Sequence, residues 1–314
     1  MKAAVYGAQG LEIRELEKPR AKAGQLLVRV RYAGLNRREL TRLKGDEGTV
    51  PGLELAGEVA EVGSEGKNFK AGDRVMAMGT GSYAEYAVVE SGQALAIPAS
   101  LDLERAAALP VALMTMYDAL VTHGELKAGE AVLIQGASSG VGLMGLQIAK
   151  LRGARLVAGS SRHAKERLKQ FGADLALDTN DPDWVETLTR ATGGKGVELV
   201  VDQVSGKIFN QTQQATAIGG RIVNVGRLGG MSAEFDFNLH ALRRLRYLGV
   251  TFRTRSRDEV AEIARRVESE LSAALEAGKL SLPVDKVFAL DEAEAAQRRM
   301  RANEHFGKIL LRMG

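Results

Sequence analysis

The first 98 residues consist of short apolar runs separated by turns that contain glycine. Between Leu27 and Tyr32 valines alternate with arginines, which is the pattern of a strand that buries one face. Many short runs with regular turn signals predict a domain similar to a β-barrel. The runs are 3–7, 11–16, 25–34, 56–63, 73–78, 83–89 and 94–98.

From about residue 131, apolar runs alternate with stretches of helical periodicity. These runs are almost entirely apolar, as in strands that are buried on both faces. Six such strands with helical connections predict an α/β fold with a doubly wound, parallel, six-stranded sheet. The runs are 131–135, 155–159, 175–178, 197–202, 221–226 and 246–252.

The clearest helix begins at Gly140, has apolar residues at helical spacing, and ends near Gly153. Two further helices are predicted over 257–277 and 291–302. A last strand is predicted over 306–312.

The composition is that of an ordinary globular protein. The chain has 314 residues, of which 45% are hydrophobic and 26% charged, and this length suits two domains. The amino-terminal residues lack the apolar core of a secretory signal, and Pro110 and Asp118 interrupt the most apolar stretch, 106–121. We therefore expect a cytoplasmic protein that does not span a membrane.

Cysteine is absent from the chain. Its absence excludes disulfides, thiolate nucleophiles and every zinc site that needs sulfur. The four histidines show no His-x-x-x-His spacing, so the sequence predicts no metal site.

The net charge of +4 and the pI near 9.2 suit either a nucleic acid or an anionic cofactor. The densest basic cluster, 242–247, reads as the end of a helix that leads into a strand. Since neither RNA-stacking aromatics nor a basic stripe is present, we do not expect nucleic-acid binding.

A glycine-rich segment, GASSGVGLMG, occupies residues 136–145 directly after a predicted strand and opens a predicted helix. Its Gly-x-Gly-x-x-Gly spacing, 140–145, fits the dinucleotide fingerprint in this context. Such glycines let the backbone approach a pyrophosphate, while the helix start offers N–H groups and positive potential. The alternative is a helix–strand contact that needs small residues. We expect the cofactor contacts here to be Ser139, Gly140, Val141 and Gly142.

The same turn also fits the Gly-x-x-x-Gly-x-Gly pattern of short-chain dehydrogenases. Those enzymes carry the turn near the amino terminus and use a Tyr-x-x-x-Lys pair. None of the six tyrosines is followed by lysine four positions later, so this assignment is disfavoured.

The end of the second parallel strand bears on the choice of nucleotide. An acidic residue that binds the NAD ribose is expected about 20 residues after the glycines, but 159–165 contains no carboxylate. Two hydroxyls and two cations suit a 2′-phosphate, so the segment favours NADPH over NADH. The alternative interpretation is that Ser161 only caps a helix and Lys165 is only solvated. It does not explain why an acidic residue is missing. The expected contacts are Ser160, Ser161, Arg162 and Lys165.

Six motifs occur in the order in which the medium-chain dehydrogenase/reductase superfamily has them, and the chain resembles its zinc-free quinone oxidoreductase (zeta-crystallin-like) branch. The resemblance extends over essentially the whole chain. It implies a GroES-like β-barrel catalytic domain over 1–112 and 256–314, and a Rossmann NADPH-binding domain over 113–255. The motifs are GLNRRE (34–39), PGLELAGEVAEVG (51–63), AGDRV (71–75), SYAEY (82–86), AAALPVALMTMYDAL (106–120) and FGKILL (306–311).

The resemblance also bears on Glu54, because zinc-dependent members have a histidine immediately before this glutamate. Here that position is Leu53, and no cysteine is available. The resemblance implies that Glu54 is structural, paired with an arginine in the cofactor cleft, and not a metal ligand. The alternative is a partly solvated carboxylate at the start of a strand.

The resemblance implies that Asn36 and Thr115 lie near the nicotinamide as catalytic candidates. The Asn36 amide would donate a hydrogen bond to a substrate carbonyl or orient the ring, whereas a turn asparagine is the alternative. Thr115 would otherwise be a helix threonine that bonds to the preceding turn. Glu39 would hold water or a proton, or be an exposed helix residue.

Further cofactor contacts are expected where parallel strands end, since ligands of open α/β sheets bind there. These candidates are Val225, Gly226, Phe252 and Arg253. Thr179 occupies a position where relatives often have a tyrosine against the adenosine phosphate.

These observations predict an NADPH-dependent, zinc-free reductase of quinones or other α,β-unsaturated carbonyls, with its active site between two domains. An enoyl-thioester or enal reductase is the first alternative, and a zinc-type alcohol dehydrogenase is a more distant one. A non-catalytic, crystallin-like protein that binds NADPH or RNA is the alternative from another class. Relatives dimerise through the edge of the Rossmann sheet, so a homodimer that pairs through 246–252 is expected.

Overall fold

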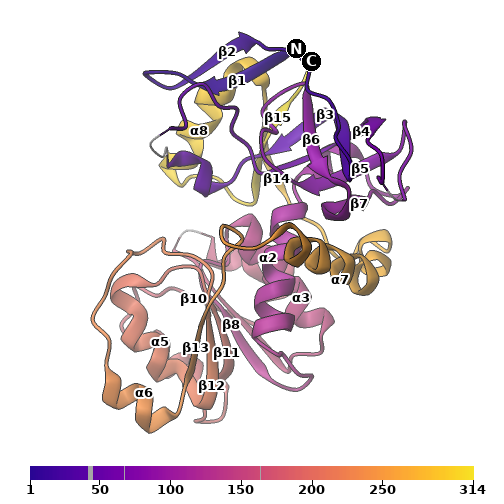
Figure 1. The fold of residues 1–314 in the computed structure, drawn as a ribbon. Helices are drawn as coiled ribbons and strands as arrows, with labels where there is room; N and C mark the ends of the chain where they lie inside the picture. The colour runs from indigo at the N-terminus through magenta and orange to yellow at the C-terminus, as the bar shows by residue number, and fades with distance from the viewer. Residues whose placement is uncertain (42–44, 67, 163) are drawn as a thin grey trace. The chain divides into compact units, whose positions relative to one another are not determined.

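The computed structural model describes residues 1–41, 45–66, 68–162 and 164–314 (Figure 1). The chain divides into two compact units. Unit 1 comprises Met1–Val111 and Arg255–Gly314, and unit 2 comprises Ala112–Thr254. Each unit has its own sheet and its own core.

Unit 1 is built on a seven-stranded sheet. Its strand order is β14-β15-β3-β4-β5-β7, with β6 also paired to β3, while β1 and β2 form a separate antiparallel pair. This arrangement confirms the predicted GroES-like β-domain. The strands are β1 (Lys2–Tyr6), β2 (Leu11–Glu15), β3 (Gln25–Gly34), β4 (Glu54–Val62), β5 (Arg74–Met78), β6 (Tyr86–Glu90), β7 (Ala94–Ala96), β14 (Val284–Ala289) and β15 (Lys308–Arg312).

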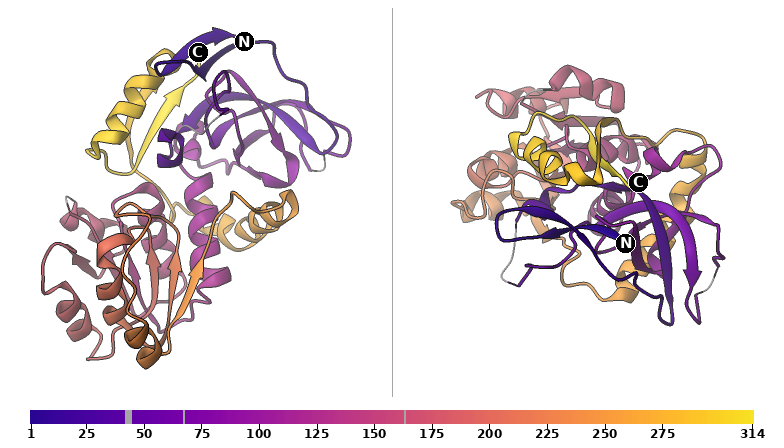
Figure 2. Two further views of the ribbon diagram at one scale, coloured as in Figure 1. Left: turned by 60° about the vertical axis from the view of Figure 1, so that its left-hand side comes forward. Right: turned by 90° about the horizontal axis from the view of Figure 1, so that it is seen from above.

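The predicted alternation along β3 is confirmed. Val28 and Val30 are buried, whereas Arg29 between them is exposed. The carboxy-terminal strand β15 runs antiparallel to β3 and parallel to β14, so the second segment of unit 1 adds two strands to the sheet that β3 begins. Both termini lie at the same end of unit 1 (Figure 2).

Short helices connect the strands of unit 1, and two longer helices belong to its second segment. Their bounds are η1 (Arg37–Leu40), η2 (Ser91–Gln93), α1 (Leu103–Ala107), α7 (Arg257–Glu276), η6 (Leu290–Glu292) and α8 (Ala293–Ala302). The capping box between Ser256 and Glu259 begins α7, which explains why this helix starts where the sequence predicts.

Unit 2 contains a six-stranded, wholly parallel sheet in the order β10-β9-β8-β11-β12-β13. The prediction of a doubly wound sheet is confirmed, and β13 is an outer strand. The strand order reverses between β8 and β11. The strands are β8 (Ala131–Ile134), β9 (Leu156–Ser160), β10 (Leu175–Leu177), β11 (Val197–Asp202), β12 (Thr216–Asn224) and β13 (Arg246–Gly249).

The connections in unit 2 are mostly helical. The helix predicted after β9 is the 3₁₀-helix η4 over Lys165–Phe171. Only Leu168 of this segment is buried, and Gly172 ends it with a left-handed φ of 98°. The other helices are α2 (Pro110–Tyr117, which begins in unit 1), η3 (Asp118–His123), α3 (Gly140–Leu151), α4 (Trp184–Ala191), η5 (Gly206–Ile208), α5 (Phe209–Ala215) and α6 (Phe237–Arg243).

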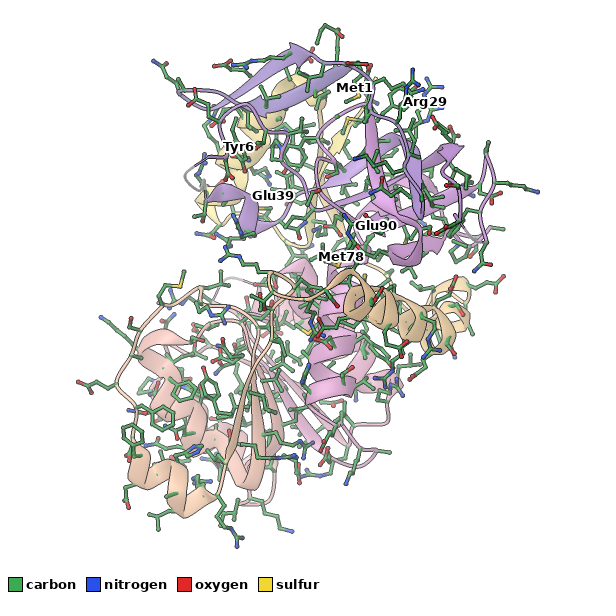
Figure 3. The ribbon with its side chains drawn as sticks, in the orientation of Figure 1. Met1, Tyr6, Arg29, Glu39, Met78 and Glu90 are labelled. Atoms are coloured by element: carbon green, nitrogen blue, oxygen red, sulfur yellow. The ribbon has the colours of Figure 1, made fainter. Side chains whose placement is uncertain are left out.

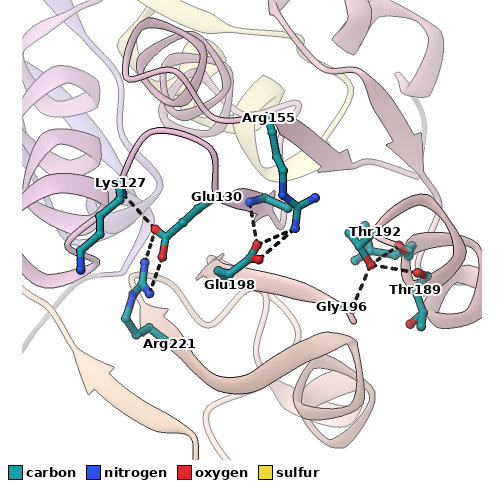
Figure 4. A network of polar contacts seen from close by, with 10 residues as sticks. Lys127, Glu130, Arg155, Thr189, Thr192, Gly196, Glu198 and Arg221 are labelled. Atoms are coloured by element: carbon teal, nitrogen blue, oxygen red, sulfur yellow. Dashed lines mark hydrogen bonds and ion pairs between the residues drawn. The ribbon is translucent and has the colours of Figure 1, made fainter. Parts of the chain in front are cut away.

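Ion pairs tie together the amino-terminal side of the parallel sheet (Figure 4). The Arg221 guanidinium donates to both carboxylate oxygens of Glu130, over 2.9 and 2.6 Å. Glu198 accepts from Arg155 and from the backbone N–H of Ala131, where β8 begins. These ion pairs therefore link neighbouring strands near their amino-terminal ends. Ligands of such sheets bind at the opposite edge, beyond the carboxyl ends of the strands.

Within the described residues, the structure has no helix that is both long enough and apolar enough to cross a membrane.

Candidate functional site

The glycine turn joins β8 to α3 and is folded tightly against the start of that helix. A Cβ atom added at Gly142 would lie 2.6 Å from both the Cα atom of Ala137 and the carbonyl oxygen of Gly136. Gly136 itself has a φ of 67°, which favours glycine. The turn thus disfavours side chains at these glycines, and such a tight turn at a helix start suits a pyrophosphate.

Ser139 is the N-cap of α3. Its hydroxyl accepts a hydrogen bond from the backbone N–H of Gly142 over 3.0 Å. The predicted contacts Gly140 and Val141 form the first turn of the same helix. Their backbone N–H groups therefore lie at the positive end of a helix of 12 residues.

Two neighbouring strands hold this turn in place. Ser160, at the end of β9, accepts from the backbone N–H of Gly136 over 3.2 Å. Gln203, just after β11, donates to the carbonyl of Gln135 over 2.9 Å and accepts from the Ser139 hydroxyl over 3.3 Å. The predicted residues Ser139 and Ser160 therefore lie at one turn. Gln203 was not predicted, although a polar residue directly after a buried strand is the signal for it.

The cations predicted to bind a 2′-phosphate lie just beyond β9. Arg162 and Lys165 are exposed, whereas Ser160 and Ser161 are buried. Ser161 also caps locally, because its hydroxyl accepts from the backbone N–H of Ala164 over 3.1 Å. The capping role uses the Ser161 hydroxyl, whereas a 2′-phosphate would bind the Arg162 and Lys165 side chains. Capping by Ser161 therefore does not exclude cofactor binding by this segment.

Polar residues also gather where β11 and β12 end, at the carboxyl edge of the parallel sheet. Asp202 is fully buried, and its carbonyl accepts from the N–H groups of Val225 and Gly226, over 2.8 and 3.1 Å. Burial raises the pKa of the Asp202 carboxyl, against hydrogen bonds from Ser205 and Val204 that lower it. The structure thus brings the predicted residues Val225 and Gly226 next to a carboxylate that the sequence analysis did not assign to the site.

The remaining cofactor candidates lie at the two outer strands of the parallel sheet. Thr179 follows β10 and is half-buried. Phe252 and Arg253 follow β13, and only Phe252 is partly buried. The glycine turn follows the inner strand β8, so Thr179 follows a strand two positions away in the sheet, and Phe252 and Arg253 follow a strand three positions away.

In unit 1, Glu54 is completely buried and belongs to a polar cluster. One of its oxygens pairs with the Lys308 ammonium and accepts from the Asn36 amide over 2.9 Å. Its other oxygen accepts from the backbone N–H of Val111 over 2.8 Å. The partner is a lysine of the last strand instead of the expected arginine, and the alternative of a partly solvated carboxylate is wrong.

Asn36 is the N-cap of η1, and both ends of its amide are engaged within unit 1. The oxygen accepts from Lys308 over 3.0 Å. The nitrogen donates to Glu54 and, at a longer 3.3 Å, to the carbonyl of Gly34. A Cβ atom at Gly34 would lie 2.5 Å from the Glu54 carboxylate, so this glycine provides the space that the cluster occupies.

Glu39 extends the cluster on the other side of Asn36. Its carboxylate accepts from the backbone N–H of Asn36 over 3.0 Å and from the Tyr83 hydroxyl, and Tyr6 donates to its carbonyl over 2.7 Å (Figure 3). Burial raises the pKa of Glu39 to about 7, although the bonds from Tyr83 and Asn36 and the charge of Lys308 oppose this. Glu39 is thus a buried titratable group, and the alternative of an exposed helix residue is wrong.

The residues around Glu54 do not fit a zinc ion. Both carboxylate oxygens already accept hydrogen bonds, one of them from a buried lysine. Cysteine is absent from the whole sequence. Among the residues that the structure describes, no three histidine, aspartate or glutamate side chains form a group that could hold a metal.

Thr115 lies on the part of α2 that belongs to unit 2. It is half-buried, between the buried side chains of Met114 and Met116. The two predicted catalytic residues, Asn36 and Thr115, therefore belong to different units.

Comparison with known proteins agrees with both units. Residues 22–99 match the family described as alcohol dehydrogenase GroES-like domain, and residues 140–269 match the family described as zinc-binding dehydrogenase. The quinone oxidoreductase of Homo sapiens is 28% identical over 316 residues, which cover 97% of this chain and 94% of that protein.

Solved structures resemble the chain over its full length. A probable oxidoreductase from Mycobacterium abscessus is 32% identical with a TM-score of 0.84, covering 99% of this chain and 98% of that one. A structure described as an NAD-dependent alcohol dehydrogenase is 30% identical with a TM-score of 0.85, and both chains are covered completely. The chain therefore belongs to the medium-chain dehydrogenase/reductase family, in the branch that contains the quinone oxidoreductases.

Proposed function

We propose that this protein is an NADPH-dependent, zinc-independent reductase that transfers hydride to quinones or other α,β-unsaturated carbonyls. The observation that carries the proposal is the glycine turn at the start of α3, beside a strand end with two exposed cations and no carboxylate. The likeness to quinone oxidoreductases supports the substrate class.

The preference for NADPH rests on the segment after β9. Arg162 and Lys165 carry positive charge and are exposed, so they are accessible to a 2′-phosphate. Guanidinium groups bind phosphate through paired, charge-assisted hydrogen bonds. An acidic side chain in this segment would select the ribose hydroxyl of NADH instead, and 159–165 contains none.

The bound cofactor supplies the hydride, and the protein has to orient the substrate, exclude water and favour the oxygen that gains negative charge. We assign the last task to Asn36, supported by Thr115. Glu54 and Lys308 fix both ends of the Asn36 amide, and the longer 3.3 Å contact to Gly34 is the one that a substrate oxygen would most easily replace. This chemistry needs no metal, in agreement with the hydrogen bonds that occupy Glu54.

A second copy of this chain is the proposed partner. The edge strand β13 leaves backbone groups unpaired on one side, which favours pairing with another strand. Large apolar side chains are exposed close to it in sequence: Met231, Phe237, Leu242 and Tyr247. We expect light scattering with gel filtration to give the mass of a dimer, and a monomer mass would contradict this part of the proposal.

The proposed activity is tested by following absorbance at 340 nm with purified protein, a 1,4-quinone and either NADPH or NADH. We expect rapid, protein-dependent loss of NADPH and slower loss of NADH. Turnover of enals or enoyl thioesters without turnover of quinones would move the assignment to those substrates. Tight NADPH binding without turnover of any of these substrates would indicate a non-catalytic protein, and a preference for NADH would contradict the cofactor assignment.

A further inference from the structure

We propose that Ser205 is a positioning residue that holds the loop 225–230 in register with the glycine turn, and thereby sets the place of the nicotinamide half of NADPH relative to its phosphates. This inference rests on the proposed function and concerns the same cofactor site.

The backbone of Ser205 adopts a conformation that is essentially reserved for glycine. Its φ is 55° and its ψ is −149°. A residue with a side chain persists in this region only where its surroundings hold it there, and such residues concentrate at functional sites. Ser205 lies three residues beyond the end of β11, on the edge of the sheet where ligands bind.

Hydrogen bonds from three neighbours hold Ser205 in this conformation. Its hydroxyl accepts from the Asn224 amide over 2.6 Å, and shares its proton between the Gly226 carbonyl at 3.0 Å and the Asp202 carboxylate at 3.2 Å. The same carboxylate accepts from the backbone N–H of Ser205 over 2.8 Å. One small side chain therefore links the ends of β11 and β12.

The two loops beyond these strands are joined along their length. Gly229 donates its N–H to the carbonyl of Val204 over 2.7 Å, and Ser205 forms a parallel bridge with Gly230. A Cβ atom at Gly206 would lie 2.3 Å from the carbonyl oxygen of Gly229. The loops are thus packed backbone to backbone, so a displacement of Ser205 moves 225–230 as well.

The segment that carries Ser205 also reaches the glycine turn. Gln203 donates to the carbonyl of Gln135 and accepts from Ser139. Residues 203–205 therefore contact the phosphate-binding turn on one side and 225–230 on the other. The pyrophosphate is expected on the turn and the nicotinamide ribose toward 225–230, so residues 203–205 set the distance between the two halves of the cofactor site.

The test compares intact NADPH with adenosine 2′,5′-bisphosphate, which keeps the adenosine and its 2′-phosphate but lacks the nicotinamide half. The variants are Ser205→Ala, which keeps the backbone demand and loses the hydroxyl, and Ser205→Gly, which removes both. Ser232→Gly is the matched control, because Ser232 is an exposed loop residue. Affinities are measured by calorimetric titration, and melting temperatures report whether each variant folds.

We expect both Ser205 variants to weaken NADPH at least tenfold while changing the affinity for the bisphosphate less than twofold. The glycine variant should fold at least as readily as the alanine variant, so it provides the result if the alanine variant does not fold. Ser232→Gly should bind both ligands as the native protein does.

Two results would overturn the inference while leaving the proposed function intact. One is native NADPH affinity in both Ser205 variants, and the other is an equal loss of NADPH and bisphosphate, which would indicate general disruption of the site. Failure of the native protein itself to bind NADPH would overturn the proposed function, and the inference with it.

Discussion

The polar cluster around Glu54 in unit 1 and the glycine turn in unit 2 hold polar groups in opposite ways. In the cluster, Glu54 and Lys308 are buried and satisfied by one another and by Asn36. In the turn, backbone N–H groups lie at the start of α3, and the cations predicted to bind a 2′-phosphate, Arg162 and Lys165, are exposed to solvent. The charges of the cluster are paired without a ligand, whereas the turn offers helix-start N–H groups that a bound phosphate would accept from.

This difference indicates which property each region controls. Removing one charge from the cluster leaves another charge buried and unpaired, so the main effect should be on the free energy of unfolding. Changing an exposed cation beside the turn costs little folding energy but should alter which nucleotide binds. The following predictions test this division, from the largest expected effect to the smallest.

Lys308→Met should lower the free energy of unfolding by about 3–5 kcal/mol, because the Glu54 carboxylate stays buried without its partner. The double variant Glu54→Gln with Lys308→Met should recover part of this loss, because no buried charge remains. Lys150→Met is the control, since Lys150 pairs with Asp174 at the surface and should change stability by less than about 1 kcal/mol. Urea unfolding measures the free energy of unfolding of all three variants. Equal losses in Lys308→Met and Lys150→Met would contradict the conclusion that the buried cluster controls stability.

Glu39 should make stability depend on pH. Its pKa is raised to about 7 in the folded protein, so the folded state binds a proton that the unfolded state has already released. Stability contributed by protonated Glu39 is therefore full below the ordinary carboxyl pKa and is lost as pH rises toward and through 7, by about 3 kcal/mol in total. Glu39→Gln should flatten the curve over this interval.

The control for this measurement is Glu61→Gln, which changes an exposed carboxylate on β4. That variant should keep the native slope of unfolding free energy against pH. An unchanged slope in Glu39→Gln would show that Glu39 is ionised throughout this range.

Gly142→Ala should destabilise the protein by about 1–3 kcal/mol, because the new methyl group would overlap backbone atoms at 2.6 Å. NADPH affinity should fall as well, since the turn has to open. Gly249→Ala is the matched control, because a Cβ atom there meets nothing within 4 Å. Thermal melting and NADPH titration of both variants measure the effect, and equal behaviour would contradict tight packing at the turn.

Arg162→Asp should leave the melting temperature nearly unchanged and weaken NADPH at least tenfold more than NADH, a difference of about 1.4 kcal/mol. Lys169→Asp places the same charge change on an exposed residue of η4 and should not alter the preference. Equal loss of both nucleotides in Arg162→Asp would contradict the assignment of the 2′-phosphate.

The fold could be predicted largely because its signals are local. Alternation along β3 and apolar runs such as 197–202 indicate strands without knowledge of their partners. A helix after 155–159 was predicted, but its 3₁₀ geometry over Lys165–Phe171 was not, because a short, mostly exposed stretch does not distinguish α from 3₁₀ geometry.

The candidate site could be predicted only in part, because its key contacts are not local. Glu54 was recognised as unusual, but its partner Lys308 is 254 positions away, and the motif FGKILL that contains Lys308 does not indicate which side chain it pairs with. Ser205 was missed for another reason, since a strained backbone cannot be seen in a residue type that suits many turns. The glycine turn was found because both its residues and its flanking elements lie within one short segment.

The pairing of Glu54 with Lys308 also has a consequence for the order in which the protein is made. Unit 1 needs the strand Lys308–Arg312, and every residue of unit 2 is synthesised before this strand. Since domains generally fold as they emerge, the parallel sheet can form while the barrel-like sheet still lacks a strand and Glu54 lacks its countercharge. During synthesis the nascent chain would therefore carry a folded unit 2 while the sheet of unit 1 still has an open edge, and emergence of Lys308–Arg312 would supply both the missing strand and the partner of Glu54.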